Sequence, residues 1–327
     1  MHQGNKALTT RSYRPVVIIA GPTASGKSDC AVTLARLING EIINADTAQM
    51  YTRISVGTAK PSDWRFHDIP HHLFDVCSEP IDFDVVQYRS RIVALVDEVT
   101  SRQKTPILVG GSLFYIKSLL FPPHAIKGDV AAIPPCVHAL STQQLWNHLH
   151  EIDSVRAAQI HMHDTYRVMR ALAIWYDSGE KPSALVPQFK PPFPVQMLFL
   201  SPPLEQLYER INRRTELMVN AMGWIDEVAG LVQDSSWWEF VKAKGFIGYA
   251  ALAEWIEAGG VAAELPTVIA HIQQDTRNYA KRQRTFWRSF MRQLEAAALE
   301  SPRDTCALIE ATCKSEGISL LLKNLEQ

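Results

Sequence analysis

The sequence has few cysteines, and their spacing gives no sign that they act together. The five cysteines are widely separated, and none of them forms a CxxC pair. This spacing argues against a disulfide framework and a zinc site. It favours buried free thiols in a reducing compartment, so we expect a cytoplasmic protein.

Long apolar runs and a strong net charge are also missing. No stretch of about 18 apolar residues occurs, so we expect no membrane-spanning helix. Residues 1–14 are polar and basic, which does not fit a secretory signal. The formal net charge of −1 points to no partner of either sign. A chain of 327 residues can bury a sizeable core in one large or two modest domains, and we expect a monomer.

The first part of the chain alternates short apolar runs with segments of helical period. We predict that the apolar runs are strands and the periodic segments helices. Short buried strands separated by helices indicate a parallel sheet covered on both faces. The predicted strands are residues 15–20, 41–45, 72–76 and 106–109, and the predicted helices are residues 27–38, 83–102 and 112–120.

The pattern changes at Phe121. Two Pro-Pro pairs bracket a stretch that is typical of a loop, and only helical patterns follow until about residue 176. A strand is predicted again at 195–200, and only helices are predicted after residue 204. We therefore predict an α/β core over residues 1–121, a helical insertion over 122–188, and a return to the core with C-terminal helices over 189–327. The C-terminal part is expected to be all-helical beyond its first strand.

A glycine-rich segment between the first predicted strand and helix matches GxxxxGK[ST], the phosphate-binding P-loop. Backbone N–H groups of such a loop turn toward phosphate oxygens at a helix N-terminus, where the helix dipole favours an anion. Lys27 adds a positive charge, and the Ser28 hydroxyl suits Mg²⁺. The alternative is an ordinary turn before a helix. The expected substrate-binding residues are Gly21, Pro22, Thr23, Ala24, Ser25, Gly26, Lys27 and Ser28.

The strand predicted at 106–109 ends in Gly110-Gly111-Ser112, where nucleotide hydrolases carry a metal-binding acid. An acid follows the second predicted strand instead, at Asp46. Ligands of parallel sheets bind at the carboxyl ends of the strands, so Asp46 could accept a proton from an acceptor substrate there. Asp46 could equally cap the following turn. These physical arguments leave the two roles evenly matched.

Basic residues are concentrated in two helical segments near the C-terminal end. Residues 277–292 hold six cations and no acid, and Tyr279, Phe286 and Trp287 are interleaved with the cations, which suits RNA phosphates and bases. A solvated helix face with an aromatic core face is the alternative. Arg210 and Arg214 are spaced i,i+4 and share a helix face. Their guanidinium groups could clamp a diphosphate, or pair with Glu209 and Glu216.

The ordered set of motifs between about residues 15 and 290 resembles the tRNA dimethylallyltransferases, which are also called tRNA isopentenyltransferases. The matching motifs are GPTASGKS at 21–28, NADTAQMY at 44–51, VGTAKP at 56–61, PHHL at 70–73 with Asp75, PILVGGS at 106–112, HD at 163–164 with Arg167, RAL at 170–172, SGEKP at 178–182, RINRR at 210–214 with Met218, IGY at 247–249, and TR at 276–277 with AKRQ at 280–283. Chance does not readily produce this order.

The resemblance implies transfer of a dimethylallyl group from dimethylallyl diphosphate to N6 of the adenine 3′ of the tRNA anticodon, with Mg²⁺ as cofactor. It implies a P-loop-type parallel sheet with a helical insertion. By similarity, Asp46 is the general base, and Thr23 positions a phosphate oxygen or the base. Lys27 and Arg214 would neutralise the departing diphosphate, and Arg210 would help to bind it.

The resemblance also implies tRNA contacts, in the anticodon stem-loop, through four segments and through Ser112. The expected RNA-binding residues are Asp46, Thr47, Ala48, Gln49, Ser112, Asp164, Thr165, Tyr166, Arg167, Val168, Gly245, Tyr249, Lys281, Arg282, Gln283, Arg284 and Trp287.

The sequence departs from the family pattern at several of these places. The departures are Asn44, Ser112-Leu113, Thr165-Tyr166, Ala250-Ala251 and the stretch from 120 to 145. They bear on RNA contact and on the insertion rather than on the chemistry. Two other functions remain as alternatives. One is a P-loop kinase that uses ATP on a small metabolite, and the other is a non-catalytic RNA-binding protein.

Overall fold

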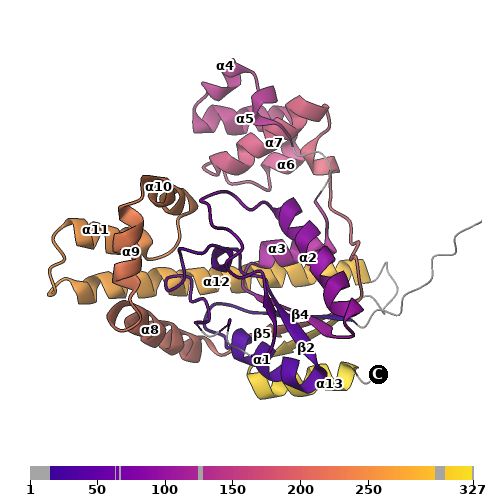
Figure 1. Ribbon diagram of the computed structural model, residues 1–327. Coiled ribbons are helices and arrows are strands. Elements are labelled where there is room, and N and C mark those ends of the chain that lie inside the picture. The colour runs from indigo at the N-terminus through magenta and orange to yellow at the C-terminus, as the bar shows by residue number, and fades with distance from the viewer. Residues whose placement is uncertain (1–14, 63, 66–67, 124–127, 299–305, 326–327) are drawn as a thin grey trace, which may run out of the picture. The chain divides into compact units, whose positions relative to one another are not determined.

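The core of the protein is a parallel sheet of six strands in the order β3-β2-β4-β1-β5-β6 (Figure 1). The computed structural model describes residues 15–62, 64–65, 68–123, 128–298 and 306–325. The strands are β1 (Val16–Ala20), β2 (Gly40–Asn44), β3 (His71–His72), β4 (Thr105–Gly110), β5 (Val195–Leu200) and β6 (Cys306–Ala311). Every residue of β1, β2, β4 and β5 is buried, which confirms the prediction of buried parallel strands.

Helices cover both faces of this sheet. On one face, α1 (Lys27–Ile38) and α13 (Lys314–Leu325) pack over alternate strand residues such as Ile19 and Leu198. Successive residues of a strand point to opposite faces, so Phe199 points to the other side, where α12 (Leu265–Ala298) packs on it. The helices α2 (Val85–Ser101) and α3 (Leu113–Leu120) contact each other, and α3 also contacts α12.

Among the described residues after β5, the regular elements are helices, with one exception. The helices before α12 are α8 (Leu204–Asn220), α9 (Trp224–Val232), α10 (Ser235–Lys244) and α11 (Tyr249–Glu257). The prediction of an all-helical C-terminal part was wrong at residues 306–311, which form β6 and pair in parallel with β5. The sequence CALIEA contains few residues that favour strands, so its structure comes from pairing with a buried neighbour rather than from local propensity.

Residues Phe121–Lys190 form a second compact unit with a core of their own. Leu145 and Leu149 of one helix pack with Val168 and Leu172 of another. The insertion predicted from the sequence spans residues 122–188. The unit's helices are α4 (Pro135–His138), α5 (Thr142–Ile152), α6 (Ser154–Ala157) and α7 (Thr165–Ser178). Across the described parts of both units, no helix is long and apolar enough to cross a membrane.

The indole ring of Trp287 joins α12 to the sheet. It is only 2% exposed and stacks on Phe199, with 4.0 Å between the ring centroids and 4° between the ring planes. A side chain so placed is part of the core. The ring is therefore not exposed for stacking on an RNA base, and the RNA contact expected of Trp287 stays a prediction.

We expect Trp287→Ala to lower the free energy of unfolding by about 3–5 kcal/mol, because it removes a buried ring from a packed site. Arg288→Ala, at the exposed neighbouring position, should change it by less than about 0.5 kcal/mol. Denaturant unfolding followed by circular dichroism measures both values. Native stability in Trp287→Ala combined with weakened RNA binding would support the RNA role and contradict the core role.

Candidate functional site

The P-loop connects β1 to α1 at the carboxyl edge of the sheet, in the strand–loop–helix order that the motif requires. Gly26 caps α1 with a φ of 89°, which favours glycine. Gly21 lies so close to β5 that an added Cβ would stand 2.7 Å from the Leu200 carbonyl oxygen. The backbone of residues 21–28 is thus held in a compact turn whose N–H groups lie at the helix N-terminus.

Three charged residues from three elements share this edge: Lys27 of α1, Arg214 of α8 and Asp46 after β2. Burial lowers the pKa of Lys27 to about 8, although Asp46 opposes this shift. Burial raises the pKa of Asp46, and the charges of Lys27 and Arg214 oppose that shift. Burial lowers the pKa of Arg214 in the same way, with Asp46 acting against it. Poor solvation therefore makes each of these charges depend on the others.

Arg214 reaches the P-loop directly. Its Nη2 donates to the Thr23 hydroxyl at 2.5 Å. Its Nε atom and the Ser25 hydroxyl are buried and have no hydrogen-bond partner among the described residues. A buried donor without a partner is costly, and an anion in the loop would supply acceptors. Arg214 and Ser25 therefore fit an anionic ligand better than an empty site.

Asp46 fills the capping role that its sequence position allowed. Its Oδ1 accepts from the Ala48 N–H at 3.3 Å, at the start of the short 3-10 helix η1 (Thr47–Met50). Asn44 holds the turn, because its amide donates to the Asp46 carbonyl at 2.9 Å and accepts from the Asp46 N–H at 3.0 Å. The cap uses one carboxylate oxygen, so it leaves the other oxygen for chemistry. The two roles that the sequence left open are compatible.

Gln283 of α12 ties the P-loop to the end of β4. Its Oε1 accepts from the Thr23 N–H at 2.8 Å, and its Nε2 donates to the Gly111 carbonyl at 3.0 Å. The side chain is only 6% exposed. We expected Gln283 to contact RNA, and the structure instead uses both ends of its amide to brace the site. A contact of this kind, between segments that are far apart in the chain, has no signature in the local sequence.

The other residues that we expect to contact RNA fall into two groups, one with buried and one with accessible side chains. The side chains of Val168 and Tyr249 are buried, like those of Trp287 and Gln283, so they present little surface to RNA in this structure. The RNA contacts expected of these four residues stay predictions. Residues with at least partly accessible surface in the sheet unit are Thr47, Ala48, Gln49, Ser112, Gly245, Lys281, Arg282 and Arg284. In the second unit they are Asp164, Thr165, Tyr166 and Arg167, of which Tyr166 is 80% exposed.

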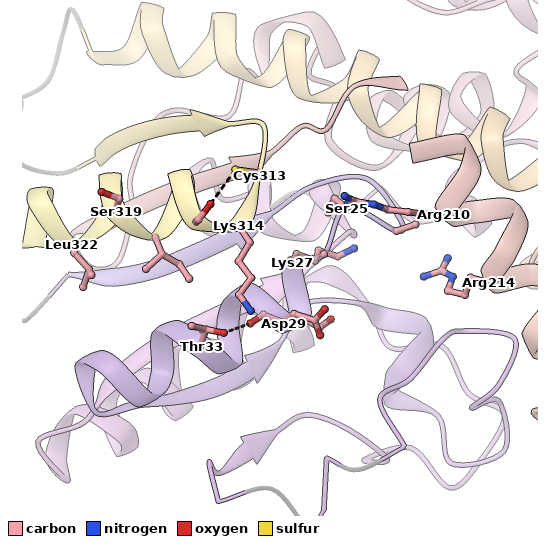
Figure 2. Close-up of a pocket in the computed structure, with 15 residues that line it drawn as sticks. Ser25, Lys27, Asp29, Thr33, Arg210, Arg214, Cys313, Lys314, Ser319 and Leu322 are labelled. Carbon is pink, nitrogen blue, oxygen red and sulfur yellow. Dashed lines mark hydrogen bonds between the residues drawn. The ribbon is translucent and has the colours of Figure 1, made fainter. Parts of the chain in front are cut away.

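Two cavities meet at the P-loop, with Lys27, Ser28 and Arg214 lining both. The outer cavity, of about 1070 Å³, lies between the P-loop, α8 and the start of α13. Figure 2 shows Arg210 and Arg214 on one side of it and Lys314 on the other. Sequence analysis missed Cys313 and the first two residues of α13, Lys314 and Ser315, because nothing in the sequence indicated that α13 folds back onto α1.

The inner cavity, of about 350 Å³, extends from the P-loop along the carboxyl edge of the sheet. Asp46, Gln49 and Thr23 supply polar groups, while Phe74 and Val109 supply apolar surface. Thr58 and Ala59 of the VGTAKP segment form part of its wall. Sequence analysis identified the VGTAKP motif but did not place it at this site. The cavity combines an anion grip, a carboxylate and an apolar wall.

A metal at this site would need ligands beyond the protein. The described residues contain no cluster of three or more His, Cys, Asp or Glu side chains suited to a metal ion. The Ser28 hydroxyl lies where both cavities meet. Mg²⁺ commonly binds through few protein ligands together with phosphate oxygens and water. The residues present therefore fit Mg²⁺ only when a bound diphosphate supplies further oxygens.

These features define an α/β protein with a P-loop whose anion site adjoins a carboxylate. A family model described as IPP transferase matches residues 49–290. A tRNA dimethylallyltransferase of Geobacter sulfurreducens is 36% identical over 292 residues, covering 87% of this chain and 91% of the relative. One from Lacticaseibacillus paracasei is 35% identical over 305 residues, covering 90% and 94%.

Solved structures agree with this result. The tRNA isopentenylpyrophosphate transferase of Bacillus halodurans superimposes with a TM-score of 0.61 at 28% identity, over 96% of this chain and 97% of that one. A eukaryotic dimethylallyltransferase acting on tRNA superimposes with a TM-score of 0.70, over 94% of this chain and 77% of that one. Because the two sequences are only 24% identical, this match supports the fold alone. The chain belongs to the IPP transferase family, which confirms the resemblance drawn from the motifs.

The lowered pKa of Lys27 predicts how anion binding depends on pH. A bound anion favours the charged ammonium, so the pKa of Lys27 is higher in the complex than the value of about 8 in the free protein. Affinity for sulfate, which keeps its charge over this range, should be highest below pH 8. It should fall above pH 8 by up to about tenfold per pH unit.

Isothermal titration calorimetry from pH 7 to pH 10 measures this dependence. In Lys27→Arg, where the guanidinium stays charged, the affinity should change much less with pH. Equal pH dependence in the wild type and Lys27→Arg would show that another group controls anion binding.

Proposed function

We propose that the protein transfers a dimethylallyl group from dimethylallyl diphosphate to N6 of the adenine 3′ of the anticodon in tRNA and releases diphosphate. The observation that carries the proposal is the meeting of Lys27, Arg214 and Asp46 at one sheet edge, beside a cavity with apolar surface. The curated relatives that cover most of the chain are named tRNA dimethylallyltransferase. The relatives' activity is consistent with that site.

The leaving group determines the rate of such a reaction. N6 attacks the allylic carbon of the donor, the C–O bond breaks, and its electron pair stays on the diphosphate. Lys27, Arg214 and the P-loop N–H groups would stabilise the growing charge, and they act strongly because they are poorly solvated. Thr23 is held between Arg214 and Gln283, so its hydroxyl would stay oriented toward a phosphate oxygen. The loop serves here to bind diphosphate and not to transfer phosphate.

The proton released from N6 must pass to a base on the side of the cavity that the adenine would enter. Asp46 lines the inner cavity, and burial raises the pKa of its carboxylate, which makes the ionised form a stronger base. The target adenine would leave its stack to enter the site, at a cost of a few kcal/mol. Exposed cations such as Lys281 and Arg282 on α12 would bind the RNA backbone.

Mg²⁺ would be held by the Ser28 hydroxyl and by diphosphate oxygens. When bound, it would neutralise part of the leaving group's charge. We also propose, from composition alone, that the enzyme acts in the cytoplasm.

A metabolite kinase that uses ATP is the alternative function. A nucleotide hydrolase fits less well, because β4 ends in glycine, without the acid that metal-dependent nucleotide hydrolases place there.

The transfer reaction can be measured directly. Incubation of the protein with labelled dimethylallyl diphosphate, Mg²⁺ and unmodified tRNA should label the RNA at the adenine 3′ of the anticodon. Consumption of ATP with a small alcohol, and no label in RNA, would favour the kinase. RNA binding with neither reaction would favour a binding protein.

Asp46→Asn separates the role of Asp46 as a general base from its role as a helix cap, because asparagine also caps helices well but is not a base. We expect kcat to fall by about 10²- to 10⁴-fold, which is the range for loss of a general base. The affinity for tRNA should change little. Asp68→Asn, which removes an exposed carboxylate from a surface ion pair with Arg36, is the control and should keep wild-type kcat. Unchanged transfer in Asp46→Asn would remove Asp46 from the mechanism.

Removal of the metal tests the role of Ser28. Transfer should be lost in excess EDTA and return when Mg²⁺ is added. Ser28→Ala should need more Mg²⁺ for half-maximal rate, by about tenfold if one of the metal's few protein contacts is lost. Full activity in EDTA, or the same Mg²⁺ requirement in both proteins, would contradict this assignment.

A further inference from the structure

One carboxylate outside the P-loop site collects an unusual set of donors. Glu227 of α9 accepts from three consecutive backbone N–H groups: its Oε2 lies 2.7 Å from those of Ser55 and Val56, and its Oε1 lies 3.1 Å from that of Gly57. The Tyr249 hydroxyl at the start of α11 donates to the same Oε1 at 2.7 Å. Successive N–H groups that converge in this way form an anion-binding turn, which a side chain fills here.

The bound segment is the one that forms part of the inner cavity wall. Residues 55–60, which we call the wall loop, include Thr58 and Ala59. The wall loop is closed at its other end by Lys60, whose ammonium donates to the Tyr51 carbonyl at 2.7 Å and pairs with Asp75. Glu227 therefore holds the first three residues of the wall loop, and Lys60 anchors its last residue.

The wall loop also contacts the turn that carries Asp46. The amide nitrogen of Gln49 donates to the carbonyl oxygens of Thr58 at 3.0 Å and Ala59 at 3.2 Å. Gln49 belongs to η1, the 3-10 helix that Asp46 caps. A continuous set of contacts thus runs from Tyr249 through Glu227, the wall loop and Gln49 to Asp46, the proposed general base.

The packing against Gly57 leaves little freedom for another arrangement. A Cβ at this position would lie 2.4 Å from the Trp224 indole nitrogen and 2.5 Å from the Tyr249 ring. Both aromatic residues are almost fully buried, at 2% and 1% exposed, so neither can move aside easily. The wall loop fits against α9 and α11 only in the presence of glycine.

We propose that Glu227 is a positioning residue, which holds the wall loop in the shape that binds the allylic donor. Tyr249 acts through Glu227, so the start of α11 controls the cavity. This inference rests on the proposed function, because it assigns the cavity to the donor. It adds residues far from the P-loop to those that set donor affinity.

Glu227→Gln is the first test, because the amide keeps the size of the side chain but replaces one acceptor oxygen with a donor. We expect the KM for dimethylallyl diphosphate to rise about tenfold, from loss of hydrogen bonds to a charged group, with kcat at saturating donor within about threefold of wild type. Asp226→Asn changes an exposed neighbouring carboxylate on α9 and should leave both values unchanged.

Native-state amide hydrogen exchange provides a readout that does not depend on activity. In Glu227→Gln, the amides of Ser55, Val56 and Gly57 should exchange at least about tenfold faster, while those of the central strands keep wild-type protection. Gly57→Ala should raise donor KM by another route, because its Cβ displaces the wall loop. Tyr249→Phe should raise donor KM less than Glu227→Gln, and the double variant should match Glu227→Gln alone.

Unchanged donor KM and unchanged exchange in Glu227→Gln would overturn the proposal. Faster exchange throughout the sheet would also overturn it, because Glu227 would then serve general stability. If the wild-type protein transferred no dimethylallyl group, the proposed function would fail. Exchange at residues 55–57, and donor affinity measured by calorimetry, would still decide the role of Glu227.

Discussion

The arrangement of the site depends on three charges at the carboxyl edge of the sheet, two cations and the carboxylate that stabilises them. Lys27, Arg214 and Asp46 are poorly solvated, and burial acts against the charged form of each. With all three ionised the group carries one excess positive charge. An anionic ligand removes that excess, and it supplies acceptors for the orphaned donors of Arg214 and Ser25. The site therefore fits an anionic ligand, whatever the reaction.

The fold brings these charges together from distant parts of the chain. The parallel arrangement places the ends of β1, β2 and β4 at one edge, so the P-loop, Asp46 and Gly111 are neighbours. Long-range side-chain contacts then fix their spacing. Gln283 braces the P-loop from α12, Arg214 reaches it from α8, and Glu227 holds the wall loop from α9. The C-terminal helices thus position a site whose chemistry lies mainly in the first hundred residues.

Much of this organisation could be predicted from the sequence, because it rests on local patterns. The P-loop, the buried strands and the acid after the second strand each have a short signature. What could not be predicted depends on contacts between distant residues. Gln283 and Trp287 lie in a basic aromatic segment that is typical of RNA contact, yet tertiary packing turns them inward. The strand β6 has weak local propensity and forms because β5 offers an edge. The backbone donors gathered by Glu227 come from residues about 170 positions away.

The central claim is that the P-loop holds diphosphate as a leaving group. It can be tested with dimethylallyl diphosphate that carries ¹⁸O at the oxygen between carbon and phosphorus. Cleavage of the C–O bond leaves that oxygen on the diphosphate, so mass spectrometry should find the label in the released diphosphate, with alkylated tRNA as the other product. Label in a free alcohol, or phosphate transferred to an acceptor, would show cleavage of the P–O bond. That result would contradict the account and return the loop to phosphoryl transfer.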